Sequence, residues 1–181
     1  MSEEHSAFWT WLGRFVLAEN IEGMLEIGCG DGRNSELVAR YTGVEQNVRA
    51  VSAGMRKYPG AQLIHGNWLS IADDELSNGY DLVLAAGVVE HRPHYREFVK
   101  KAVGVGAKWT IITFGYGLDW DCDVMATTEC QEPPGWVYDN RYSERVLLRW
   151  LADNGYADRH EVLTFAHEGV GEDAALIIRA E

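Results

Sequence analysis

The chain has 181 residues, 46% of them hydrophobic, and a formal net charge of −12 at pH 7. This length and composition predict one domain, residues 1–181, with a sizeable core. The acidity disfavours a nucleic-acid partner, whose phosphates would repel it, although a local basic patch stays open. No apolar stretch is long enough to cross a bilayer, which argues against a membrane partner.

The N-terminus and the cysteines indicate the compartment. Met-Ser-Glu-Glu-His lacks the basic region of a signal peptide. Cys29, Cys122 and Cys130 are an odd number with no C-x-x-C pair, which predicts free thiols, a reducing compartment and no zinc cluster. We therefore expect a cytoplasmic protein.

Strands and helices alternate over the first two thirds of the chain. Apolar residues at helical spacing predict a helix over residues 5–18. Strands are then expected at 23–28, 42–45, 62–65, 81–86 and 108–114, and helices at 32–40, at 47–57 and after Pro93. Such alternation predicts a parallel sheet with right-handed crossovers.

The pattern changes after residue 114. Residues 115–140 show no clean period, and a loop of this length is usually functional. Ser143 is a good N-cap for a helix that ends at Asn154-Gly155. Two further strands, 157–166 and 173–180, are separated by glycine-containing residues and predict a hairpin.

The most informative stretch is residues 24–32, Met-Leu-Glu-Ile-Gly-Cys-Gly-Asp-Gly. An apolar strand runs into three glycines at alternate positions, and a predicted helix follows. Glycine allows a tight turn and a close ligand approach, and the free amides of a helix start would face that ligand. The dinucleotide pattern G-x-G-x-x-G is excluded, because Arg33 stands at its last position.

An acid followed by three alternating glycines resembles the first motif of the class I S-adenosylmethionine-dependent methyltransferases. The resemblance continues through residues 42–45, which end in Glu45, through 66–68, and through 80–91, which end in Glu-His. Asn67 departs from it, because an aspartate is commoner there. The resemblance covers about residues 20–115 and implies a Rossmann-like α/β fold, doubly wound and mostly parallel, with seven strands and an antiparallel C-terminal hairpin strand.

The resemblance also implies S-adenosylmethionine as cofactor and assigns residues to it. The N-terminal helix, residues 1–20, would cover the cofactor mouth. The expected cofactor-binding residues are Glu26 near the amine, Gly28, Cys29, Gly30 and Gly32 at the methionine end, Glu45 on the ribose, Gln46 beside it, Asn67 and Trp68 at the adenine, and Ala86. The plainer alternatives are an ordinary tight turn for the glycines, a solvated acid for Glu45 and a core aromatic for Trp68.

Two residues after the fourth strand are the catalytic candidates. His91 would be the general base, because imidazole titrates near neutral pH and the reacting methyl is expected there. Glu90 would orient His91 or contact the cofactor. The alternative is that His91 only caps or packs.

Residues 115–140 are expected to form the acceptor loop, with Tyr116, Trp120, Trp136 and Tyr138 as substrate-binding residues. Aromatic and acidic side chains together suit an amine or another cation. The alternative is a solvated acidic loop whose aromatics pack on the sheet. The Asp119-x-Asp121-x-Asp123 run lacks the glycine and distal glutamate of a calcium loop, so no metal is assigned.

The sequence therefore predicts transfer of a methyl group to an oxygen or nitrogen nucleophile of a small-molecule acceptor. One alternative is a cofactor-binding module that is inactive or needs a partner. Phe8, Trp9 and Trp11 could supply an apolar face for a homodimer or heterocomplex. Another alternative is an acceptor that is a protein or a nucleic acid.

Overall fold

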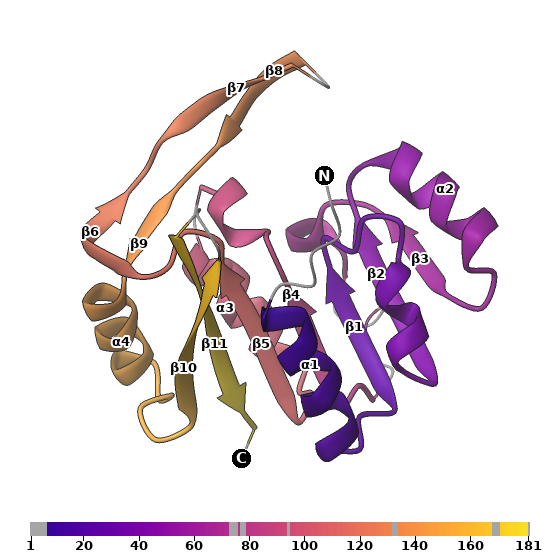
Figure 1. Cartoon of the computed structure of the whole chain (residues 1–181), viewed down its shortest axis with the longest axis horizontal. Helices are drawn as coiled ribbons and strands as arrows, with labels where there is room; N and C mark the ends of the chain where they lie inside the picture. Colours follow the sequence, from indigo (N-terminus) through magenta and orange to yellow (C-terminus); the bar gives the residue numbers. More distant parts are fainter. Residues whose placement is uncertain are drawn as a thin grey trace.

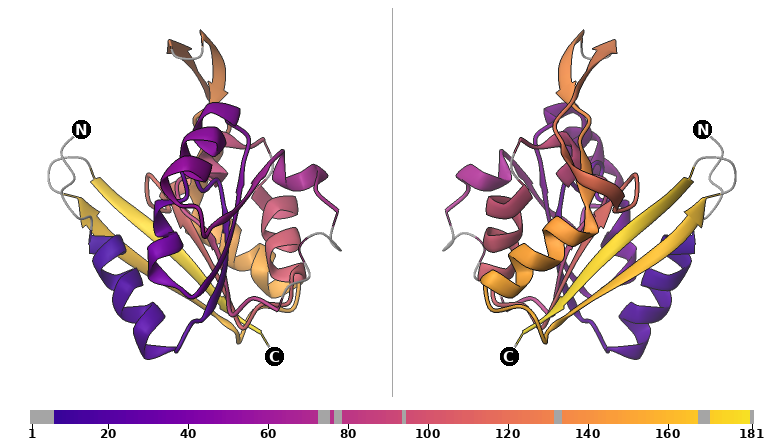
Figure 2. Two further views of the ribbon diagram at one scale, coloured as in Figure 1. Left: turned by 90° about the vertical axis from the view of Figure 1, so that its right-hand side faces the viewer. Right: turned by 90° about the vertical axis from the view of Figure 1, so that its left-hand side faces the viewer.

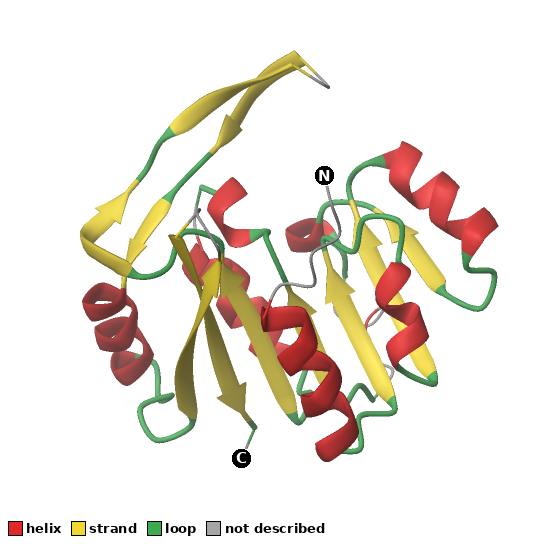
Figure 3. Cartoon of the chain, in the orientation of Figure 1, coloured by secondary structure: helices red, strands yellow, loops and turns green. Residues whose placement is uncertain are grey.

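A seven-stranded sheet of order β10-β11-β5-β4-β1-β2-β3 forms the centre of the molecule (Figures 1 and 3). The computed structural model describes residues 7–72, 76, 79–93, 95–131, 134–167 and 171–180. The parallel strands are β1 (Gly23–Ile27), β2 (Arg40–Glu45), β3 (Gln62–His65), β4 (Leu82–Ala85) and β5 (Trp109–Phe114). β11 (Gly171–Arg179) pairs antiparallel with β5 and with β10 (His160–His167).

The central strands are apolar because helices cover both faces of the sheet. Every residue of β1 and of β4 is buried, as expected for parallel strands between two helical layers. The helices α1 (Ala7–Ala18) and α2 (Val48–Lys57) lie on one face (Figure 2). The helices α3 (Tyr95–Gly104) and α4 (Glu144–Asp153) lie on the other. The predicted fold class, including the antiparallel C-terminal strands, is confirmed.

The helix α1 packs flat against the sheet. Phe8, Leu12 and Val16 are buried, and the Phe8 ring meets the edge of Phe165 in β10 at 5.5 Å between centroids. Residues 1–6, which precede α1, lie outside the described residues. The cofactor-covering role expected for residues 1–20 stays a prediction.

The helix predicted over residues 32–40 is wrong. The structure has only a short 3₁₀ helix, η1 (Arg33–Leu37), and Val38 is already extended. Arg40 must pair with Gly23 to begin β2 in register. A complete βαβ crossover needs at least about 10–12 residues including its helix, and the glycine turn uses several of those between Ile27 and Arg40. Too few remain for an α-helix.

The irregular loop predicted over residues 115–140 is also wrong. It contains β6 (Asp119–Val124), β7 (Thr127–Gln131) and β8 (Pro134–Tyr138), and β9 (Arg141–Ser143) follows. β6 pairs with β9 and β7 with β8, both antiparallel. Together they form a two-stranded ribbon, residues 119–143, that projects from the body (Figures 1 and 2).

The physical reason lies in the residues of β6. Acids alternate with Trp120, Cys122 and Val124, which is the period of a strand, where successive side chains point to opposite faces.

Among the described helices, none has the length and apolar character that crossing a membrane requires.

Candidate active site

A cavity lies at the carboxyl ends of the parallel strands, where ligands bind in open sheets of this kind. Its walls come from the ends of β1 and β2, from the residue after β3, and from the segment after β4. The lining residues are Ile27, Gly28, Val44, Glu45, Gln46, Gly66, Trp68, Gly87, Val88, His91 and Arg92. Five of the predicted site residues are therefore brought together: Gly28, Glu45, Gln46, Trp68 and His91.

Gly28 forms the floor of this cavity, and only glycine fits there. Its φ is +73°, in the left-handed region, and a Cβ would lie 2.4 Å from a methyl carbon of Val88. Gly30 also has positive φ, +58°, but a Cβ there would meet nothing within 4 Å. Gly28 thus needs glycine for both close packing and backbone conformation, whereas Gly30 needs it for backbone conformation alone.

Three amides of the glycine turn are already engaged within the protein. Gly28 and Cys29 both donate to the carbonyl of Val44, at 2.7 and 3.2 Å. Gly30 donates to Glu45 Oε2 at 3.0 Å. The turn therefore provides space for a ligand, while its own amides hold it against β2.

Glu45 is fixed in orientation by the same contacts. Its Oε1 accepts from the amide of Asn47 at 2.7 Å, and Oε2 accepts from Gly30. A carboxylate has about four acceptor sites, so each oxygen keeps capacity for a further donor. Glu45 is consequently held at the cavity wall in a position to accept two hydroxyl groups.

Glu26 does not line the cavity. It is 4% exposed and accepts hydrogen bonds from Asn34 Nδ2, at 2.7 Å, and from the Tyr41 hydroxyl. Burial raises the pKa of Glu26 to about 7, although both hydrogen bonds favour the ionised form. In this structure Glu26 joins η1 to β2 behind the glycine turn. Of the other predicted cofactor residues, Cys29, Gly30, Gly32, Asn67 and Ala86 also lie outside the lining.

Arg92 is a cavity residue that the sequence reasoning missed. In the amide orientation that satisfies both side chains, the oxygen of Gln46 lies 3.2 Å from Arg92 Nη1. Asn67 Oδ1 accepts from the Leu69 amide and is 3.5 Å from Arg92 Nη1. Burial lowers the pKa of Arg92, and the charge of Glu45 opposes that shift. Its only sequence signal was a basic residue directly after His91.

Trp68 is both a core residue and a cavity residue. It is 1% exposed, packs near the Phe98 ring, and lies under the ammonium of Lys101 at 5.1 Å. Its indole N–H has no hydrogen-bond partner among the described residues. Both readings of Trp68 from the sequence are therefore compatible with its position.

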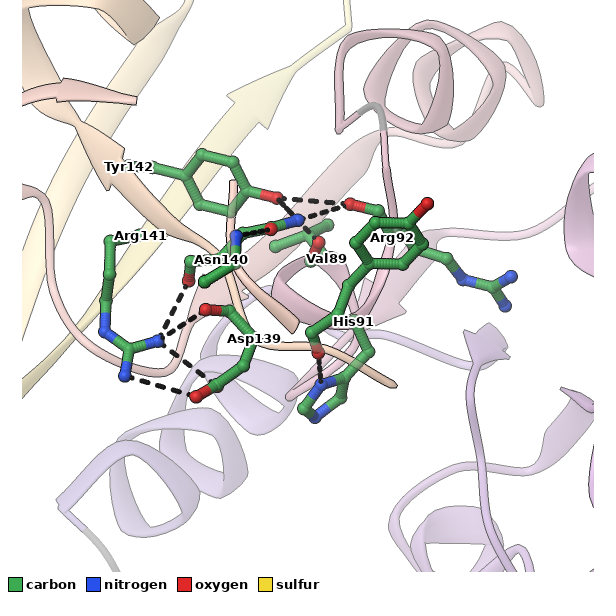
Figure 4. A network of polar contacts seen from close by, with 9 residues as sticks. Val89, His91, Arg92, Asp139, Asn140, Arg141 and Tyr142 are labelled. Atoms are coloured by element: carbon green, nitrogen blue, oxygen red, sulfur yellow. Dashed lines mark hydrogen bonds and ion pairs between the residues drawn. The ribbon is translucent and has the colours of Figure 1, made fainter. Parts of the chain in front are cut away.

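The ring of His91 is held by the ribbon. His91 ends the short helix η4 (Val89–His91), and its Nδ1 lies 2.7 Å from the main-chain oxygen of Tyr138 (Figure 4). A carbonyl only accepts, so Nδ1 carries the proton in this contact. In the neutral ring Nε2 is then left with a lone pair, as a general base requires.

Asn140 fixes the base of the ribbon to the same segment (Figure 4). It is 1% exposed, and its main-chain N–H donates to the carbonyl of Glu90 at 2.9 Å. Its Nδ2 donates to the carbonyl of Arg92 at 2.6 Å and its Oδ1 accepts from the Ala126 amide at 3.1 Å. Tyr142 adds a hydrogen bond to the carbonyl of Val89. The segment with His91 and the ribbon base are thus one hydrogen-bonded unit.

Comparison with known proteins agrees with this geometry. Residues 25–105 match the family described as "Methyltransferase domain". No curated protein matches the chain.

Similar solved structures share the fold at low sequence identity. Magnesium protoporphyrin IX methyltransferase from Synechocystis PCC 6803 with bound SAM has 13% identity and a TM-score of 0.68, over 95% of this chain and 77% of that chain. A putative S-adenosylmethionine-dependent methyltransferase from Listeria monocytogenes has 15% identity and a TM-score of 0.69, over 96% and 97%. The N-terminal domain of EvdMO1 with SAH bound has 19% identity and a TM-score of 0.68, over 94% and 80%.

Residues 25–105 therefore match a methyltransferase domain, and the chain has the fold of the S-adenosylmethionine-dependent methyltransferases described above. The cavity residues fit that cofactor. Gly28 lets the chain turn against Val88 at the cavity without a side chain, Glu45 is held ready to accept hydroxyl donors, and Trp68 presents an aromatic wall.

Glu90 is not among the residues that line the first cavity. It is buried, and its Oε2 has no hydrogen-bond partner among the described residues. A Cβ on Gly115 would lie 2.4 Å from Oε1, so the carboxyl group faces the start of the segment after β5. Burial is the main cause that raises the pKa of Glu90, which favours its neutral form.

The predicted substrate-binding residues are only partly brought together. Tyr116 and Trp120 line a second cavity of about 400 Å³ beside the ribbon base. Tyr138 has an exposed side chain, while its carbonyl holds His91. The side chain of Trp136 lies outside the described residues.

One acid of β6, Asp123, makes side-chain contacts with the body of the molecule. Asp123 accepts from the Ser143 amide at 3.1 Å and lies 3.4 Å from Arg96. Across the described residues, no group of three or more His, Cys, Asp or Glu side chains is placed to hold a metal ion.

Proposed function

We propose that this methyltransferase transfers a methyl group to an oxygen or nitrogen nucleophile of a small-molecule acceptor, with His91 as the general base. The observation that carries the proposal is the contact of His91 Nδ1 with the Tyr138 carbonyl, at 2.7 Å. It fixes the tautomer and leaves Nε2 available at the wall of the cofactor cavity.

The residues around the cavity support a specific cofactor orientation. Gly28 would face the methionine end, Glu45 would accept the ribose hydroxyls, and Gln46 and Trp68 would border the adenine. Glu26 would act indirectly, by holding η1 through Asn34 and Tyr41. When bound, S-adenosylmethionine supplies a methyl group already activated on a sulfonium. The protein's own task is then to position the acceptor and to accept its proton at His91 Nε2.

One of the similar structures is named for a small-molecule acceptor, magnesium protoporphyrin IX. This supports the substrate class without indicating which molecule this chain methylates. A partner-dependent or inactive module is the competing proposal, because the exposed apolar side chains of the ribbon, among them Met125 and Val137, suit a protein contact.

The test combines calorimetry with S-adenosylhomocysteine and a methyl-transfer assay against a panel of amines, phenols and carboxylic acids. We expect binding of the cofactor product and turnover on at least one acceptor, with turnover reduced in His91→Asn. Binding without turnover on any acceptor would favour the module. Absence of binding by the folded protein would contradict both proposals.

A further inference from the structure

The second cavity lies near the end of the sheet that contains β5, β11 and β10. It is formed by the segment after β5, the ribbon base, the start of α4 and the end of the β10–β11 hairpin. The lining residues are Tyr116, Gly117, Leu118, Asp119, Trp120, Arg141, Glu144, Val162, Thr164 and Glu172. Ala174 pairs with Phe114, the last residue of β5, so Glu172 lies just beyond the edge at which the first cavity opens.

The lining carries an excess of negative charge. It includes the carboxylates of Asp119, Glu144 and Glu172 and a single basic residue, Arg141. Within the described residues, none of these three carboxylates has a hydrogen bond or an ion pair through its side chain. A cleft lined mainly by one sign of charge attracts the opposite sign.

Arg141 does not cancel this charge, because it is already engaged. Its guanidinium carbon lies 3.3 Å from the centroid of the Tyr116 ring, and its Nη1 lies 3.2 Å from Asp139 Oδ1. The hydrogen bond from Arg141 is the main cause that lowers the pKa of Asp139. The charge of Arg141 is therefore matched by a carboxylate outside the cavity lining.

Trp120 provides an aromatic surface at this cavity. Its side chain is 44% exposed, although tryptophan normally buries most of its area. It makes no ring stacking and no cation–π contact with the described residues. A cation close to a tryptophan face is stabilised by the ring quadrupole, and tryptophan is the strongest of the aromatic residues in this respect.

The two cavities are adjacent through a short chain of contacts. Tyr116 lines the second cavity, and its ring contacts Arg141, which forms an ion pair with Asp139. Asp139 directly follows Tyr138, whose carbonyl holds His91 in the wall of the first cavity. A ligand seated against Tyr116 and Trp120 could therefore extend its other end toward His91.

We propose that the second cavity anchors a positively charged amine or ammonium group of the methyl acceptor, with Trp120 as its aromatic wall and the surrounding carboxylates as its counter-charge. This inference deepens the proposed function and rests on it, because the proposed function identifies the anchored ligand as the methyl acceptor. The anchored cation is distinct from the nucleophile, which would lie at the His91 end.

Three probes of matched shape test the charge preference: phenethylamine, 2-phenylethanol and phenylacetate. Their binding is measured by calorimetry, with and without saturating S-adenosylhomocysteine. We expect phenethylamine to bind about tenfold or more tightly than 2-phenylethanol, and phenylacetate to bind most weakly.

Two variants and a control locate the binding. The triple variant Asp119→Asn, Glu144→Gln, Glu172→Gln should remove the preference for the amine. Trp120→Ala should weaken amine binding by about two- to fivefold, the range for an exposed cation–π contact. Glu97→Gln, a change to an exposed acid on α3, should leave amine binding as in the wild type.

The outcomes separate this inference from the proposed function. Equal binding of the amine and the alcohol, or an amine preference that survives in the triple variant, would overturn the inference. Normal binding of S-adenosylhomocysteine with no binding of any probe would overturn it too, and would leave the proposed function standing. Selective amine binding by protein that fails to bind S-adenosylhomocysteine would support a cation site and contradict the proposed function.

Discussion

The imidazole of His91 donates through Nδ1 to the main-chain oxygen of Tyr138 over 2.7 Å, so the projecting ribbon holds the ring of the proposed base. The two residues are 47 positions apart in the chain. Because the acceptor is a main-chain carbonyl, the contact does not depend on the side chain at position 138. It depends on where the ribbon base lies.

Replacing His91 by asparagine should separate its two roles. The Nδ2 of asparagine sits close to the position of Nδ1 and can still donate to the Tyr138 carbonyl, but no group remains at Nε2. We expect kcat to fall by about 10²–10⁴-fold, the usual contribution of general acid–base catalysis, with unchanged affinity for S-adenosylhomocysteine. Steady-state kinetics and calorimetry measure the two. Unchanged turnover would remove His91 from the mechanism.

Asn140 should stabilise the base of the ribbon. In Asn140→Asp the donor that faces the Arg92 carbonyl is replaced by a buried carboxylate, and we expect a loss of about 2 kcal/mol or more in the free energy of unfolding. Tyr142→Phe removes the hydroxyl that donates to the Val89 carbonyl and accepts from Asn140 Nδ2, but it buries no charge and should therefore cost less, about 1 kcal/mol. Chemical denaturation measures both, and hydrogen exchange should rise across residues 119–143 in Asn140→Asp. Similar small effects in the two variants would contradict this role.

Glu45 should determine cofactor affinity. Glu45→Ala removes the carboxylate that accepts from Gly30 and Asn47 and that would accept the ribose hydroxyls. We expect affinity for S-adenosylhomocysteine to fall by about 1.5–3 kcal/mol, the value for hydrogen bonds to a charged group. Glu36→Ala, in which an exposed acid of η1 is removed, is the matched control for calorimetry. Equal affinities in the two variants would rule out a ribose role for Glu45.

Gly30 should tolerate asparagine better than valine. Its φ of +58° is unfavourable for β-branched residues, whereas asparagine adopts this region more readily. Since a Cβ there would meet no atom within 4 Å, the difference should come from the backbone. We expect Gly30→Val to lose at least about 1 kcal/mol more stability than Gly30→Asn, measured by thermal unfolding. An equal loss would indicate a steric cause instead.

Glu26 should make stability depend on pH near neutrality. Its pKa is raised from 4.5 to about 7 in the folded protein, so the folded state binds this proton more tightly than the unfolded state. The stabilisation is complete below about pH 4.5 and is lost as pH rises through 7. Relative to Glu26→Gln, the wild type should lose about 3 kcal/mol of unfolding free energy between pH 4.5 and pH 8. A difference that stays constant with pH would show that folding does not raise the pKa of Glu26 above its ordinary value.

The sheet could be predicted because its strands are buried on both faces. Continuous apolar runs such as Leu82–Ala85 have few alternatives to a parallel strand. The glycine turn was recognised for a similar reason, because positive φ at Gly28 and Gly32 leaves little choice of residue. Asn47 caps α2 with its side chain, where the helix was predicted to begin.

The ribbon and the amide contacts could not be predicted by local reasoning. A strand with acids on one face and exposed apolar residues on the other resembles a polar loop when it has no core to face. The amides of the glycine turn bond to Val44 and Glu45, which lie at the end of the neighbouring strand β2 and not next to the turn in sequence. Arg92 and Asn140 are brought together only by the packing of the ribbon beside η4, which no local pattern encodes.

The position of β11 constrains how the protein is made. This strand follows both β5 and β10 in the sequence, yet it is inserted between them, and the aromatic ring of Phe8 rests on Phe165 of β10. An emerging nascent chain thus has an open sheet edge at β5 and an uncovered first helix until residues up to about 179 have left the ribosome. Shielding of α1 and β5 during translation should therefore protect the growing chain from association through these surfaces.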